Sequence, residues 1–143
     1  MENLALKMRL VVLWLFMAVT MSGNTILYLI VTGVIDEIRA GKVVGMQVGP
    51  ELLLVMAVTY FWVPLVMAVL SLTLKDKVNR WVNIIIGIFY ASFILFELVM
   101  NIITVAYPYV ILMDTSAIVA AALIAWYAYK WPKQEAWHVE ETS

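Results

Sequence analysis

Long stretches of this chain carry no charge, and their lengths limit the folds open to it. Residues 10–35 and 52–74 are uncharged, and only Glu97 and Asp114 interrupt the 49 residues over 81–129. A helix needs about 20 apolar residues to cross the hydrocarbon core of a bilayer. Each of the first two stretches therefore has the length of one membrane helix, and the third has the length of two.

The third stretch has to turn once between its two helices. Pro108 lies between two tyrosines there, and it marks the turn because proline stops a helix and tyrosine favours the membrane interface. Backbone in lipid must form its hydrogen bonds internally, which favours helices throughout. The predicted fold is an all-α membrane protein, a four-transmembrane-helix antiparallel bundle. Its helices are expected at about 10–34, 51–74, 81–106 and 109–129, in a domain over 1–132 with a polar cytoplasmic tail over 133–143.

The composition supports membrane insertion and excludes several kinds of chemistry. Hydrophobic residues make up 65% of the chain and charged residues 13%, and a soluble domain of this size could not bury so much apolar surface. There is no cysteine, and the one histidine, His138, lies in the polar tail. Disulfides, thiolate metal sites, haem held by two membrane histidines and a Ser–His–carboxylate site are therefore excluded. We expect no cofactor, no metal site and no catalytic residue, and the net charge of -1 gives no sign of a nucleic-acid partner.

The basic residues predict the orientation of the chain. Two of them, Arg39 and Lys42, fall on one side of the predicted spans, and seven fall on the other. Those seven are Lys7, Arg9, Lys75, Lys77, Arg80, Lys130 and Lys133. Since lysine and arginine gather on the cytoplasmic side, both termini are expected in the cytoplasm. Aromatic residues near the span ends, Trp14 and Trp131 among them, are expected to form an interfacial belt.

Each predicted span carries a polar residue at nearly the same height. Asn24, Tyr60, Glu97 and Asp114 lie 15 to 17 residues from the basic residue that ends their span. At about 1.5 Å per residue, all four are about 22 to 25 Å from the cytoplasmic anchors. Asn101 lies one turn beyond Glu97 on the same helix face. We call these five residues the polar layer, and they are the candidate ligand-binding site.

Structural interpretations of the same residues remain open. Glu97 with Asn101 could lock two helices together, since polar side chains hold membrane helices in contact. Asp114 follows Pro108 by six residues, so it could instead reach the outer interface or cap its helix. Asn24 alone is more often an interhelical contact, and Tyr60 alone is more often a packing residue.

Two other features bear on how the helices pack. Pro64 has no N–H for the carbonyl of Tyr60, which predicts a kink and a free acceptor beside Tyr60. Small residues recur along the last predicted helix and are expected to be a close-packing surface against another helix. They are Ala117, Ala121, Ala125 and Ala128.

Three segments of the chain resemble a known family. They are Asn79-Arg80-Trp81-Val82-Asn83-Ile84-Ile85-Ile86-Gly87, Lys7-Met8-Arg9-Leu10-Val11-Val12-Leu13-Trp14 and Ala125-Trp126-Tyr127-Ala128-Tyr129-Lys130-Trp131. They are similar to a family of small uncharacterised prokaryotic membrane proteins, known only as a domain of unknown function. By helix number and size the chain also loosely resembles DoxX-like proteins, some of which are subunits of quinone-linked oxidoreductases. The resemblance implies a multi-pass protein of a prokaryotic inner or plasma membrane.

Two classes of function follow from these observations. The first is binding or transport of a small cation, an amine or an amphipathic molecule in a polar pocket in the outer half of the bundle. The second is a structural or accessory subunit of a membrane complex, in which the polar layer only locks the helices. The expected partners are the lipid bilayer, a small ligand, and a second copy or another membrane subunit. An enzyme is the least favoured class.

Overall fold

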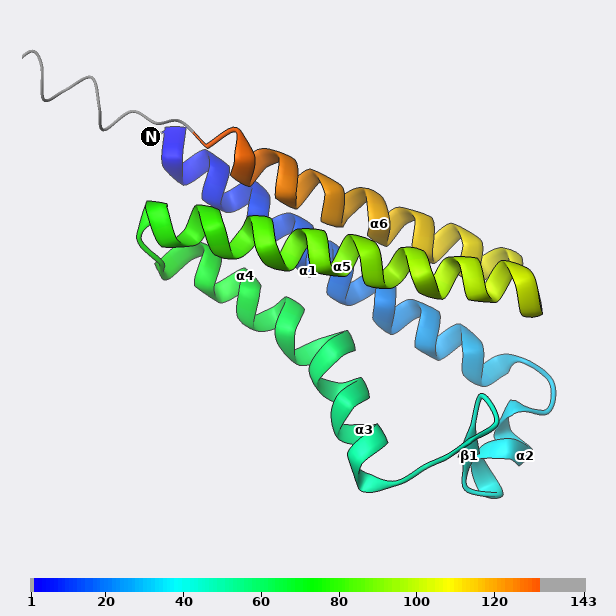
Figure 1. Ribbon diagram of the computed structural model, residues 1–143. Coiled ribbons are helices and arrows are strands. Elements are labelled where there is room, and N and C mark those ends of the chain that lie inside the picture. The colour runs from blue at the N-terminus through cyan, green and yellow to red at the C-terminus, as the bar shows by residue number, and fades with distance from the viewer. Residues whose placement is uncertain (1, 132–143) are drawn as a thin grey trace, which may run out of the picture.

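The computed structural model describes residues 2–131, and the tail expected over 133–143 lies outside them (Figure 1). Within these residues four helices are long and apolar enough to cross a membrane, which is the number that the sequence predicts. Their bounds are Asn3–Ile30, Pro50–Thr73, Asp76–Thr104 and Pro108–Tyr129.

The first and third helices begin earlier in the sequence than their predicted membrane spans. α1 is Glu2–Ile30 against an expected 10–34, and α5 is Asp76–Thr104 against 81–106. Charged residues stop a membrane span but not a helix, so both helices continue into the polar segments at their starts. α6, Pro108–Tyr129, matches the expected 109–129 because the proline at its first position sets where it begins.

The connection between the first two spans contains small elements that the uncharged runs do not indicate. α2 covers Val34–Arg39, and β1 (Lys42–Val43) pairs antiparallel with β2 (Met46–Gln47). Val44 and Gly45 join the strands with φ of 50° and 73°, the pair of positive angles that a tight hairpin turn requires. The all-α prediction therefore holds for the spans and misses this two-residue ladder.

The second span is interrupted by a π-helix. It consists of α3 (Pro50–Ala57), the π-helical turn η1 (Val58–Trp62) and α4 (Val63–Thr73). In η1 the N–H of Val63 donates to the carbonyl of Val58, five residues back. The next bond in that register would need an N–H at Pro64, which has none.

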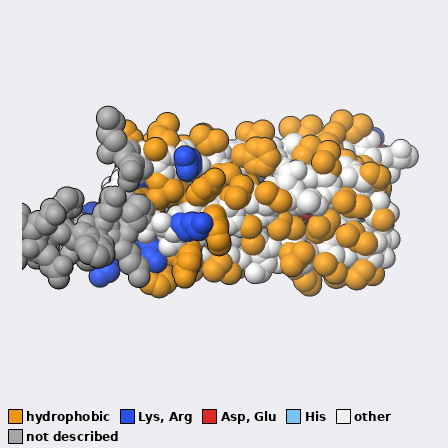
Figure 2. All heavy atoms as spheres, turned by 90° about the horizontal axis from the view of Figure 1, so that it is seen from above, with side chains coloured by type: hydrophobic (Ala, Val, Ile, Leu, Met, Phe, Trp, Pro, Cys, Tyr) orange, Lys and Arg blue, Asp and Glu red, His pale blue; other side chains and the backbone are white. Residues whose placement is uncertain are grey.

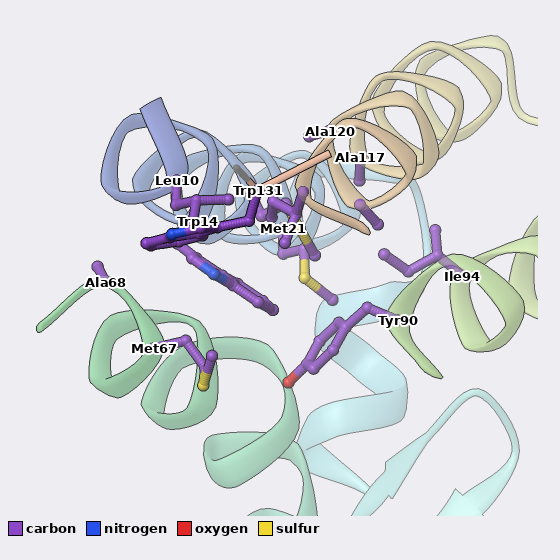
Figure 3. Close-up of a cluster of buried hydrophobic side chains, with 13 residues drawn as sticks. Leu10, Trp14, Met21, Met67, Ala68, Tyr90, Ile94, Ala117, Ala120 and Trp131 are labelled. Atoms are coloured by element: carbon purple, nitrogen blue, oxygen red, sulfur yellow. The ribbon is translucent and has the colours of Figure 1, made fainter. Parts of the chain in front are cut away.

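A side chain from another helix supplies the missing donor. The hydroxyl of Tyr90 donates to the carbonyl of Thr59 at 2.6 Å, and Figure 3 shows that hydroxyl turned toward the second span. The helix is disrupted at Pro64, as the sequence predicts. The carbonyl that loses its helical donor to Pro64 and bonds to Tyr90 is that of Thr59, however, and not that of Tyr60. The π-helix shifts the register by one residue, which explains the difference.

Helix packing is uneven along the molecule. α5 packs on α6, and α1 packs on both α6 and α4. α3 makes contacts mainly with η1, which continues the same helix, and Figure 1 shows it diverging from the other helices toward the α2 and β1 region. Every described side chain of α3 is at least partly exposed. The bundle is therefore tightest where α4 lies and opens beyond η1.

One end of the molecule gathers the basic residues. Lys7 at the start of α1 forms an ion pair with Asp76 at 3.0 Å and donates to the carbonyl of Leu74 at 3.2 Å. Arg80 donates to the carbonyl of Tyr129 at 3.4 Å. The start of α1, the α4–α5 turn and the end of α6 thus meet at what we call the basic end. Figure 2 shows most of the visible lysine and arginine side chains there and a mainly hydrophobic surface beyond it.

The predicted small-residue surface on α6 is confirmed. Ala117, Ala121 and Ala128 are buried, Ala125 is half-buried, and α6 approaches α5 closely at Gly87. A Cβ built on Gly87 would lie 3.2 Å from the carbonyl oxygen of Ala121 and 3.2 Å from the backbone nitrogen of Ala125. A side chain at position 87 would therefore require the facing backbone of α6 to move by a few tenths of an ångström.

Candidate functional site

Asn24 and Asp114 join the first and last helices at the polar layer. The Nδ2 of Asn24 donates to Oδ1 of Asp114 at 3.0 Å, and Asp114 is only 5% exposed. Asp114 lies inside α6, facing α1, because it shares a helix face with the buried Ala117 and Ala121. This placement excludes the interpretation in which Asp114 reaches the outer interface.

Tyr60 and Glu97 join the second and third spans in the same way. The hydroxyl of Tyr60 donates to Oε1 of Glu97. Tyr60 lies in the π-helix, whose extra residue changes the direction of the side chains around it. Its ring packs against Phe93, with the ring centroids 6.3 Å apart. The local disruption of the second span thus positions the tyrosine that meets the carboxyl group.

The two pairs lie on helices that pack together. Glu97 is in α5 and Asp114 is in α6, and α5 packs on α6. Within residues 3–131 the ion pairs are Lys7–Asp76 and Arg39–Asp36, so neither carboxyl of the polar layer meets a cation of that part of the chain. Each has only a neutral hydrogen-bond donor.

Two further polar atoms near this layer are buried without a partner in the described part of the chain. They are Oδ1 of Asn101 and the hydroxyl oxygen of Tyr109. Asn101 is the fifth predicted site residue, and it bonds neither to Glu97 nor to another helix through that oxygen. Tyr109, which we expected only at the interface, lies in the first turn of α6, five residues before Asp114. A buried polar atom without a partner is a feature that a ligand or a water can satisfy.

A second polar cluster, nearer the basic end, is absent from the sequence-based prediction. The indole N–H of Trp14 donates to Oδ1 of Asn83 at 2.7 Å. Nδ2 of Asn83 donates to Oδ1 of Asn79 at 2.6 Å, and Nδ2 of Asn79 donates to the carbonyl of Ser71 at 2.7 Å. All four residues are 0% exposed. The side chains of this cluster bond to one another and to the backbone. This is typical of a structural cluster that holds α1, α4 and α5 together.

The predicted interfacial belt is wrong for Trp14 and Trp131, which are buried. Trp14 lies in the hydrophobic core, edge-on to Tyr90 with ring centroids 5.7 Å apart, and Trp131 is also buried (Figure 3). Trp81 and Trp126 are more than half exposed, as an interfacial residue should be. The i,i+4 spacing of Asn79 and Asn83 was the available signal for the cluster that Trp14 joins.

An open apolar groove of about 400 Å³ lies elsewhere, between α1 and α6. Leu13 and Phe16 line it from α1, and Leu112, Val119 and Leu123 are among its α6 residues. None of the five polar-layer residues lines this groove. The polar layer and the groove are therefore separate features of the molecule.

The polar layer consists of hydrogen-bonding side chains. Within residues 2–131 no group of three or more His, Cys, Asp or Glu side chains gathers to hold a metal ion. The oxygens of two carboxyl groups, a phenol and two amides can coordinate a metal cation or accept hydrogen bonds from an ammonium group. They include no nucleophile with an adjacent base.

Comparison with known proteins gives one result. A family of unknown function, DUF6326, matches residues 3–137. Neither the curated proteins nor the solved structures include a match to this chain.

Proposed function

Since the chain belongs to DUF6326, a family of unknown function, we propose its function from its own residues. We propose that it is an integral membrane protein whose polar layer binds or transports a small cation, an amine or an amphipathic molecule. We place it in the cell membrane of a prokaryote, as the family resemblance implies. We orient it as an antiparallel bundle with both termini in the cytoplasm because of the seven-to-two division of basic residues.

The observation that carries the proposal is a pair of intramembrane carboxyl groups without a cation. Glu97 and Asp114 each receive one bond from a neutral donor, and no lysine or arginine within residues 3–131 pairs with either. A charged side chain at the centre of a bilayer costs at least about 2.5 kcal/mol on insertion scales. A cationic ligand between the two carboxyls would remove much of that cost, and an ammonium group has three donors to share among them.

The shape of the second span supports access to this layer. α3 leaves the bundle just beyond Tyr60, so helix packing around Glu97 is incomplete on that side, and Glu97 is half-buried. The unpaired Oδ1 of Asn101 lies one turn farther along the same helix. A ligand arriving from the loop side of the bundle would therefore meet an acceptor before it reaches the carboxyl groups.

The second candidate is an accessory subunit of a membrane complex, as some DoxX-like proteins are. The observation that favours it is that both carboxyls already bond to a neighbouring helix, Asp114 to Asn24 and Glu97 to Tyr60. In that case the polar layer holds the four spans together, and the partner is a second copy or another membrane subunit.

The two candidates differ in their response to cations. The purified protein in detergent is heated with ethylammonium, tetraethylammonium, spermidine, Na⁺ or Mg²⁺, and the gain in melting temperature is measured for the wild type, Glu97→Gln, Asp114→Asn and the double variant. Glu51→Gln, an exposed acid in the first turn of α3, is the matched control. The proposal expects at least one amine or cation to stabilise the wild type and the control, and expects both single variants to lose that gain.

The structural candidate expects another result. If no compound stabilises the wild type and each variant simply unfolds at a lower temperature, the polar layer is a lock and the binding proposal is wrong.

A further inference from the structure

We propose that the groove between α1 and α6 holds one acyl chain of an anionic phospholipid, whose phosphate binds Arg9. This site is separate from the polar layer. It is assigned from the shape of the groove and from the charge at one end of it.

The groove follows one face of α6. Leu112, Thr115, Val119 and Leu123, which line it, recur every three or four residues and so form a continuous strip. From Leu112 to Leu123 the helix rises about 16 Å at about 1.5 Å per residue. One leaflet of a hydrocarbon core about 30 Å thick spans about 15 Å. The strip is about as long as one leaflet is thick, but Leu112 lies beyond Asp114, so only the part near Leu123 and Val119 lies in the leaflet of the basic end.

The contact between α1 and α6 continues past the groove to a basic residue, Arg9. Arg9 lies one turn before Leu13, and Tyr127 lies one turn after Leu123. The guanidinium carbon of Arg9 lies 5.6 Å from the centroid of the Tyr127 ring, so the two helices still touch at this point. The interface between α1 and α6 thus extends from the apolar residues of the groove to Arg9, which lies over the ring of Tyr127.

The charge at this end suits a phosphate. Within residues 3–131 Arg9 pairs with no carboxylate, whereas Lys7 of the same helix is held by Asp76. Arg9 is exposed, and a guanidinium binds phosphate oxygens through two parallel hydrogen bonds. Anionic lipids are attracted to basic residues at the cytoplasmic surface, where the positive-inside rule places the basic end.

The apolar character of the groove selects an acyl chain as its occupant. Phe16, Val119 and Leu123 offer it only hydrocarbon. The hydroxyl of Ser116 at its far end already donates to the carbonyl of Leu112 at 2.8 Å. A lipid with its headgroup on Arg9 would lay one chain along Leu13 and Phe16 of α1 and along Leu123 and Val119 of α6.

Native mass spectrometry of the full chain, released from detergent, tests the site. Dioleoyl phosphatidylglycerol is the anionic probe and dioleoyl phosphatidylcholine the zwitterionic one. We expect one phosphatidylglycerol per chain in preference to phosphatidylcholine. Arg9→Gln should weaken that binding about five- to tenfold, because it removes the direct guanidinium contact with the phosphate. Lys77→Gln, another basic residue of the same end, should leave it unchanged.

A groove-filling variant tests the acyl chain. Val119 is 53% exposed, so Val119→Phe can occupy the groove without disturbing the core. It should weaken phosphatidylglycerol binding, whereas Val69→Phe on α4 should not. Equal binding of the two lipids, or equal losses from Arg9→Gln and Lys77→Gln, would overturn the proposal. It would also be overturned by dimers that bind no lipid and that Val119→Phe separates, because the groove would then hold a second copy.

Discussion

Replacing Asn83 with leucine should strongly destabilise the protein, because Asn83 is the centre of the buried cluster at the basic end. Its Oδ1 accepts from the indole N–H of Trp14 at 2.7 Å and from the hydroxyl of Ser71 at 3.3 Å. Its Nδ2 donates to Oδ1 of Asn79 at 2.6 Å. Leucine has a similar volume, so the substitution removes these bonds without opening a large cavity.

The size of the loss follows from the groups that Asn83→Leu strands. The indole N–H of Trp14 and Oδ1 of Asn79 would both lose these partners. The four residues of the cluster are all 0% exposed, so water cannot replace the lost bonds. A stranded buried polar group costs about 1–3 kcal/mol, and hydrogen bonds between membrane helices are worth nearer 0.6 kcal/mol on average. We therefore expect a loss of about 2–4 kcal/mol in the free energy of unfolding.

A double-mutant cycle separates the hydrogen bond from general packing. Trp14→Phe removes the donor that Asn83→Leu would strand, so the two losses should sum to about 1 kcal/mol more than the loss in the double variant. Unfolding in mixed SDS and detergent micelles, followed by helical circular dichroism, measures all three variants. Ser92→Leu, an exposed polar residue on the same helix, is the control. A neutral Asn83→Leu, or losses that simply add, would refute the idea of a coupled lock.

Two further predictions concern the α5–α6 contact and the orientation of the chain. Gly87→Ala should lower the free energy of unfolding by about 1 kcal/mol, because a crowded Cβ costs about 1–3 kcal/mol while alanine regains about 1 kcal/mol of helix propensity; an increase in stability would contradict the close approach. On intact cells, a thiol reagent that cannot cross the membrane should label Gln47→Cys and not Lys77→Cys, since the chain has no cysteine of its own. The reverse pattern would invert the proposed orientation.

The number of spans could be predicted because membrane crossing depends on length and apolarity, which the sequence displays directly. The height of the polar layer was also accessible, since helical rise converts residue number into depth. The structure then joins Asn24 to Asp114 and Tyr60 to Glu97. Whether this layer binds a ligand stays a prediction.

The π-helix and the buried cluster could not be predicted from the sequence, because both depend on contacts between distant residues. The register of η1 depends on a contact between Tyr90 and Thr59, which are 31 residues apart. Trp14 follows Arg9 closely and so looks interfacial, yet its burial depends on which face of α1 meets α4 and α5. Such contacts depend on how each helix is rotated about its own axis. Apolar residues indicate the buried face of a helix only when the other faces are polar, and in these spans nearly every residue is apolar.

The diverging α3 has a consequence for the fit between the protein and its bilayer. Its eight residues form a rod about 12 Å long, and a tilt of about 10° at η1 would move the Pro50 end by about 2 Å. Hydrophobic mismatch is commonly relieved by helix tilt. Because Tyr60 lies at the pivot and Asn24 and Asp114 lie on other helices, a thinner or thicker membrane could be accommodated by α3 alone. The hydrogen-bonded pairs of the polar layer would then keep their geometry across bilayers of different thickness.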